Sequence, residues 1–345
     1  MENMSLEQLT ENLFQGFTID SDALIQAVSS GNVLGAIGIL QDAVLETLGR
    51  PIDYLKEYFF ALLAVGIGAA MIKQLGLFFK DSQVQKISFW IVYLILSKHL
   101  LTLYYNGETV AKECLGTFID FGHVFIPVFS VVLTLASGSM TGVGYIATLT
   151  FIIYVIEQFL LVMMIPLVEG YMLLGLLGAL WQKDRVEKLM DFLEKGISLG
   201  FKGMFAAITG LGILQSMILP YVDYSKVGVA KKVIEMIPGV GSLAGGTMEL
   251  LGGSAVLLKN GVGVIGMLLL LLASAIPLIK IGLIYVVMKL AAVIYGLFGE
   301  KQMTWCADKL GQAEGYMLKI TGAGLMMFLL WIVLAVYTTN QKVIY

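Results

Sequence analysis

The chain has 345 residues, of which 58% are hydrophobic and only 14% charged, and its formal net charge is −3. Soluble domains carry about a quarter charged residues, so this composition excludes an ordinary soluble domain and predicts an all-helical integral membrane protein in the lipid bilayer. The lysines are scattered, with only Lys231 and Lys232 adjacent, and there are only two arginines, so we expect no nucleic-acid partner.

Residues 1–54 are predicted to form one or two amphipathic helices outside the bilayer or on its surface. No Lys or Arg occurs before Arg50, and the apolar residues recur at helical spacings. The segment opens with acidic and amide residues rather than a basic stretch followed by a short apolar run. We therefore do not expect it to be a signal peptide.

Residues 55–340 are predicted to form a polytopic transmembrane domain of about 7–9 membrane segments. The first segment, Tyr58–Phe79, is rich in small residues that let a neighbouring helix approach closely. The second covers residues 87–105, and a loop is predicted over residues 106–120. The third covers residues 121–136, with a kink or a break at Pro127.

The stretch from Val143 to Trp181 is too long for a single span. It runs for thirty-nine residues with only Glu157 and Glu169 charged, and Pro166 lies near its middle. Because about twenty apolar residues cross the hydrocarbon core, we predict two spans hinged around Pro166, or a re-entrant pair.

Residues 182–195 form a charged stretch, predicted to be a solvated cytoplasmic connector that leads into a span over residues 196–219. Residues 221–259 are amphipathic and rich in glycine, with a helix break predicted at Pro238. This segment is either an interfacial connector or a re-entrant turn. The last span is predicted around residues 322–337.

Residues 254–295 form the longest apolar stretch, and it is interrupted by Pro277, Lys280 and Lys289. By the same length argument it must form two spans, or one span and a half-helix, with the break near Pro277. Lysine within hydrocarbon is expensive, at roughly 2.5–3.5 kcal/mol at a helix centre. These lysines are therefore expected to face a bundle interior, a water-filled cavity or an interface.

No catalytic motif is present, and the sequence predicts neither an enzyme nor a cofactor. HExxH, a Walker loop and a GxSxG turn are all missing, and Cys114 and Cys306 have no metal-ligand spacing. The candidate functional residues are the four charges that lie deep in apolar stretches, namely Glu157, Glu169, Lys280 and Lys289. They either pair between helices or line a polar pathway, and the residues alone leave both possibilities open.

Four sequence blocks occur in an order that resembles the stage III sporulation protein AE family of spore-forming Firmicutes. They are FIPVFSVVLTLASGSMTG, VMMIPLVEGYMLLGLLGAL, MIPGVGSLAGGTMELLGGSAVLLKNGVGVIG and IPLIKIGLIYVVMKLAAVIY, and the resemblance covers roughly residues 50–340. It implies a non-enzymatic multi-pass subunit of the secretion-like channel complex between the mother cell and the forespore, located in the mother-cell membrane. The expected partners are the other membrane subunits of that complex and further copies of this chain.

A second hypothesis comes from another class of protein, the secondary transporters. Broken helices near Pro166 and Pro277 would bind a small solute at mid-membrane, and Glu157 or Lys280 would couple ions to its transport.

Overall fold

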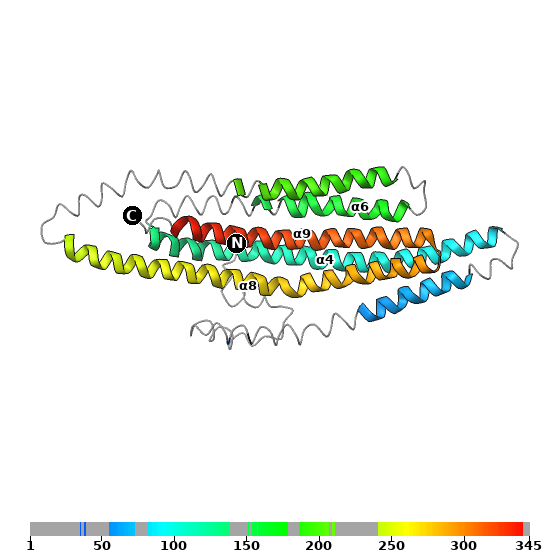
Figure 1. The fold of residues 1–345 in the computed structure, drawn as a ribbon, viewed down its shortest axis with the longest axis horizontal. Coiled ribbons are helices and arrows are strands. Elements are labelled where there is room, and N and C mark those ends of the chain that lie inside the picture. Colours follow the sequence, from blue (N-terminus) through cyan, green and yellow to red (C-terminus); the bar gives the residue numbers. More distant parts are fainter. Residues whose placement is uncertain are drawn as a thin grey trace.

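The computed structural model describes residues 55–72, 82–137, 154–156, 158–178, 186–206 and 241–340, together with positions 35, 38, 151, 209 and 210. The named elements are α4 (Ser82–Ser137), the π-helix η1 (Gln158–Met164), α6 (Ile165–Gly178), α8 (Gly241–Leu297) and α9 (Lys301–Asn340). Two further helices cover residues 55–72 and 186–206. All of these elements run along one long axis, which makes an elongated bundle (Figure 1). The prediction of an all-helical protein is confirmed for the described residues.

The helices α8 and α9 form an antiparallel hairpin joined by a tight turn at Gly299. The Glu300 amide donates a hydrogen bond to the Tyr295 carbonyl at 3.1 Å, and the Gly299 amide donates one to the Gly296 carbonyl at 3.0 Å. Gly299 has a φ of 72°, a conformation that glycine adopts without steric cost. This arrangement is a Schellman motif, and it ends α8 and reverses the chain into α9.

The bundle has an inverted distribution of polarity. Five of the described helices are long and apolar enough to cross a membrane. In the most apolar of them, Gly261–Leu297 of α8, 29% of an 18-residue apolar segment is buried, whereas 61% of such a segment is buried in Lys301–Val333 of α9. Large apolar side chains such as Leu94, Val162 and Val293 are exposed on the outside. An apolar outer surface around a more polar central helix suits a lipid environment, and the chain is a multi-pass membrane protein.

The long helices exceed the thickness of a bilayer. At 1.5 Å per residue, the 57 residues of α8 extend over about 85 Å, whereas the hydrocarbon core is about 30 Å thick. Helix tilts reach about 40°, which does not absorb such an excess. The bundle therefore projects beyond the hydrocarbon core.

The predicted loop at residues 106–120 is wrong, and so is a break at Pro127, one of the two alternatives predicted there. Both lie within α4, which is one continuous helix of 56 residues. Along the predicted loop, Glu108, Ala111, Leu115 and Phe118 follow each other at helical spacings and are all buried. Burial of this stripe keeps the stretch helical even though it contains polar residues.

The predicted break at Pro277 is also wrong, because α8 continues through this residue. Proline removes one backbone hydrogen bond, but in a membrane bundle packing on either side holds such a helix together. Ala273, Ser274 and Ile281 flank Pro277 and are buried. The expected division of residues 254–295 into two segments is therefore not found.

The chain does not reverse at Pro166, where a hinge between two spans was predicted. The π-helix η1 leads directly into α6, and Pro166 is the second residue of α6. Proline fits the first turn of a helix. Because it has no N–H, a carbonyl group in the preceding turn lacks its usual partner, and this preceding turn is the π-helix η1. The described residues show no re-entrant pair here.

Several predicted features lie outside the described residues. They include Glu157, Pro238 and nearly all of residues 1–54. Of the segment 221–259, only the second half is described, and it forms the first part of α8. The prediction of about 7–9 membrane segments stays a prediction.

Helix 55–72 packs against the end of α8 through a glycine. A β-carbon built on Gly66 would lie 2.6 Å from Cε1 of Tyr295, whose ring is fully buried. The Tyr295 hydroxyl donates a hydrogen bond to the Leu62 carbonyl at 2.9 Å, so the ring cannot move away without losing this bond. By contrast, a β-carbon on Gly68 would meet no atom within 4 Å.

We therefore expect Gly66→Ala to destabilise the protein by about 1–3 kcal/mol through overpacking. The matched variant Gly68→Ala should be neutral or slightly stabilising, because alanine favours a helix over glycine by about 1 kcal/mol. Thermal unfolding of both variants in the same detergent measures the difference. Equal stability of the two variants would contradict the packing of helix 55–72 on Tyr295.

Candidate functional site

Charged side chains from four helices gather in one section of the bundle, which we call the polar layer. Its members are Glu108 and Lys112 on α4, Glu169 on α6, Lys289 on α8, and Asp308 and Glu314 on α9. Contacts of α9 with its neighbours place them at a common level along the bundle axis. Gly107 packs against Glu314, Gly311 packs against Lys289, and the ring of Tyr171 lies edge-on to that of Tyr316.

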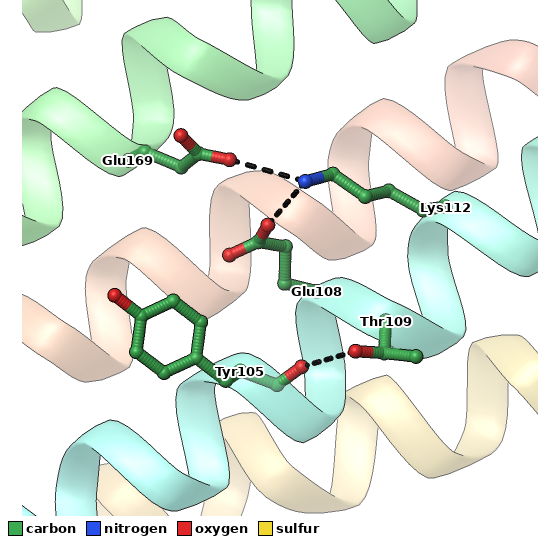
Figure 2. A network of polar contacts seen from close by, with 5 residues as sticks. All are labelled: Tyr105, Glu108, Thr109, Lys112 and Glu169. Atoms are coloured by element: carbon green, nitrogen blue, oxygen red, sulfur yellow. Dashed lines mark hydrogen bonds and ion pairs between the residues drawn. The ribbon is translucent and has the colours of Figure 1, made fainter.

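Lys112 joins α4 to α6 by bonding two carboxylates at once. Its Nζ donates a hydrogen bond to Oε1 of Glu108 on the preceding turn and another, at 3.2 Å, to Oε1 of Glu169 (Figure 2). The Glu108 side chain is only 8% exposed, whereas Lys112 is 46% and Glu169 34% exposed. A buried carboxylate without such a cation would carry a desolvation cost of several kcal/mol.

Lys289 and Asp308 make a second ion pair, between α8 and α9. The Lys289 Nζ lies 2.7 Å from Oδ1 of Asp308 and also donates to the Asp308 carbonyl at 3.1 Å. The two side chains are 30% and 44% exposed, so the pair sits at the edge of the bundle. In water such a pair contributes little, but within apolar surroundings each charge needs its partner.

Glu314 is the most deeply buried member of the polar layer. It has no exposed surface, and neither carboxylate oxygen has a hydrogen-bond partner among the described residues. Its carboxylate lies directly on the backbone of α4, in the space that a side chain at Gly107 would occupy. Two nearby groups also lack a hydrogen-bond partner among the described residues. They are Oε2 of Glu108 and the hydroxyl of the fully buried Tyr104.

These three groups lie close enough to interact electrostatically. Buried polar groups without partners are rare, because each costs about 1–3 kcal/mol, and more for a charged group. Such a group is retained at a cost to stability, which marks this part of the polar layer as the best candidate for function.

The structure places the four predicted residues differently. Glu169 and Lys289 belong to the polar layer, and each pairs with a residue of another helix. Lys280 is half-buried on α8, nine residues before Lys289, and no ion pair of it is found among the described residues. Glu157 lies outside them. In each of these two ion pairs, the partner was not predicted: Lys112 pairs with Glu169, and Asp308 pairs with Lys289.

Sequence reasoning missed four members of the polar layer. It assigned Glu108 and Lys112 to a loop, and it left residues 301–321, which contain Asp308 and Glu314, without a predicted element. The signal that would have found Glu314 is helical periodicity. Met303, Ala307, Leu310, Glu314, Met317 and Thr321 are all buried. Their spacing of three and four residues forms one continuous stripe, with Glu314 in the middle.

The polar layer is not a metal centre of a familiar type. In the part of the chain that the structure describes, no group of three or more His, Cys, Asp or Glu residues could hold a metal ion. Cys114 and Cys306 are both buried, on α4 and α9. What the polar layer offers is a set of carboxylates and ammonium groups within an apolar bundle, with the Tyr104 hydroxyl beside them.

Comparison with known proteins identifies the family. A family model described as stage III sporulation protein AE matches residues 19–339. The chain belongs to the stage III sporulation protein AE family. The stage III sporulation protein AE of Bacillus subtilis (strain 168) is 23% identical over 281 residues, which cover 81% of this chain and 70% of that protein. No solved structure matches the chain. The family resemblance seen in the sequence is thereby confirmed, and the chain is a membrane protein of sporulation.

Proposed function

We propose that this chain is a non-enzymatic subunit of a secretion-like channel complex that joins the mother cell to the forespore and sits in the mother-cell membrane. The observation that carries the proposal is the family match over residues 19–339, which includes all five candidate spans. Its partners would be other membrane subunits of the complex and further copies of this chain.

The geometry of the polar layer supports a subunit rather than an isolated protein. Lys112, Asp308 and Lys289 are partly exposed. The apolar side chains of Val286 and Leu290 are exposed near Lys289 on α8, whereas α4 exposes Thr109 and Glu113 near Lys112. A charge facing hydrocarbon costs roughly 2.5–3.5 kcal/mol, whereas one facing water or another subunit does not. Partly exposed charges of this kind are expected where subunits meet or where water enters an assembly.

The alternative hypothesis, a secondary transporter with broken helices, loses its structural basis. It requires breaks near Pro166 and Pro277, which would expose backbone groups to a solute at mid-membrane. The helix α8 continues through Pro277, and η1 continues into α6 around Pro166.

Deletion and purification test the proposal together. A spore former without this gene should fail to complete sporulation, and expression of the full chain should restore it. The tagged chain, purified in mild detergent from sporulating cells, should run as an oligomer or together with other membrane subunits. A stable monomer that accumulates a solute in liposomes, and loses this activity on Lys280→Met, would overturn the proposal in favour of a transporter.

A further inference from the structure

Helix 186–206 runs antiparallel to α6 and packs against it along the whole length of α6. Gly178 of α6 packs against Val186, Gly175 against Met190 and Gly170 against Leu193, and Met164 at the end of η1 packs against Gly200. The residues that face α6 are apolar, and Val186, Met190, Ile197 and Met204 are buried. Because η1 and α6 lie in the candidate span Tyr154–Gly178, helix 186–206 packs alongside a candidate membrane span, while it is not itself one of the five helices apolar enough to be a span.

The outer face of this helix carries a row of polar residues that we call the charged stripe. It consists of Lys188, Asp191, Lys195, Ser198 and Lys202, all exposed. Their separations of three, four, three and four residues place them on one face of an α-helix over about 21 Å. Exposed apolar residues, Leu189, Phe192 and Leu199, border the stripe on one side.

Near the start of the charged stripe, α4 and α6 expose apolar side chains. The Tyr93 hydroxyl on α4 donates a hydrogen bond to the Leu176 carbonyl on α6 at 2.6 Å, which aligns these two helices along the bundle axis. Around Tyr93, α4 exposes Trp90, Ile91, Leu94 and Ile95, and α6 exposes Leu173 and Leu177. This section of the bundle therefore exposes both apolar side chains, on α4 and α6, and the first residues of the charged stripe, on helix 186–206.

The charged stripe is incompatible with hydrocarbon. Each lysine or aspartate facing lipid near a helix centre costs roughly 2.5–3.5 kcal/mol. A lysine near a membrane surface reduces this cost by extending its ammonium group toward water. The lysines of the stripe are spread over about 21 Å, two-thirds of a hydrocarbon thickness of about 30 Å, so this relief is not open to all of them.

We propose that the charged stripe faces a water-filled space within the membrane, enclosed when this chain assembles with its neighbours. The stripe carries three lysines and one aspartate, and the exposed Glu187 lies at its edge, so this face offers charges of both signs to hydrophilic solutes. Calling this space the channel rests on the proposed function. The water exposure of the stripe itself rests on the geometry of helix 186–206.

Cysteine labelling tests this assignment in the full chain within sealed membrane vesicles. Cys114 and Cys306 are buried and would be replaced by serine to remove background labelling. Single cysteines are then introduced by Ser198→Cys and Lys195→Cys in the stripe, by Leu199→Cys beside it, and by Ile197→Cys on the buried face. Each variant is treated with a charged methanethiosulfonate reagent and, separately, with N-ethylmaleimide, which crosses membranes.

Both stripe cysteines should react with the charged reagent about tenfold faster than the Leu199→Cys variant, because the reactive thiolate forms in water and not in hydrocarbon. Ile197→Cys should resist both reagents until the protein is unfolded. Slow reaction at both stripe positions, with normal complex formation and sporulation, would overturn the inference and leave the proposed function standing. Fast reaction in a chain that forms no complex would support the water-facing stripe and sink the channel proposal. Ser198→Cys changes one atom, so it serves as the readout if Lys195→Cys fails to fold.

Discussion

Gly107→Ala is expected to destabilise the protein by about 1–3 kcal/mol, the cost of overpacking a well-filled core. The carboxylate of Glu314 occupies the space into which the new methyl group would project, and all three atoms of the carboxyl group lie within contact distance of it. Glu314 has no exposed surface, so its side chain cannot swing into solvent to make room. Thermal unfolding of the purified variant in detergent measures the effect.

The same helix offers a matched control, and α9 offers a rescue. A β-carbon on Gly116 would meet nothing within 4 Å, so Gly116→Ala should be neutral or slightly stabilising. Glu314→Ala removes the obstructing carboxylate, and the double variant with Gly107→Ala should be more stable than the sum of the two single effects. Strict additivity would show that the two residues do not touch.

Glu314→Met is expected to stabilise the protein by about 1–3 kcal/mol, the cost of an unsatisfied buried polar group. Methionine has a similar length and no charge, so it keeps the packing while removing two oxygens that lack described partners. If the polar layer takes part in channel function, the more stable variant should nevertheless restore sporulation less well than the native chain. Such a gain in stability with a loss of function is typical of polar groups retained for activity.

The control for this prediction is Glu113→Met, because Glu113 is exposed on α4 next to Lys112. A surface change of this kind should alter the stability by less than about 0.5 kcal/mol. A fall in stability for Glu314→Met would mean that Glu314 has a stabilising partner, for example in a neighbouring subunit. Increased stability with full sporulation would show that Glu314 is dispensable for function.

Sequence reasoning located membrane character well but located helix ends poorly. At residues 106–120 the polar residues Asn106, Glu108 and Lys112 predicted a loop, yet they lie inside α4. The reason is that a polar stretch can stay in a membrane helix when its charges pair, as Lys112 does with Glu108 and Glu169. Such pairing depends on a helix fifty-seven residues away in the chain, so no local pattern contains it.

The prolines show the same limit. A single Pro277 in an apolar stretch predicts a break from local backbone chemistry, because its ring removes one hydrogen bond. In the bundle, burial of Ala273 and Ile281 on either side of it outweighs that loss, and α8 stays continuous. Glu314 shows the reverse error, since it was overlooked although helical periodicity places it on the buried stripe of α9.

The sequence by itself determined that this protein is helical, resides in a membrane and belongs to the sporulation family, because composition and the order of apolar blocks carry that information. Only the tertiary structure decided which charges meet and which polar residues share an exposed face. The pairs Lys112 with Glu169 and Lys289 with Asp308 form between different helices. The apolar residues of α4 can be compared with the charged stripe only because the Tyr93–Leu176 hydrogen bond aligns α4 with α6. The physical reason is that the cost of a charge in a membrane depends on its partners and its depth, and both are set by packing.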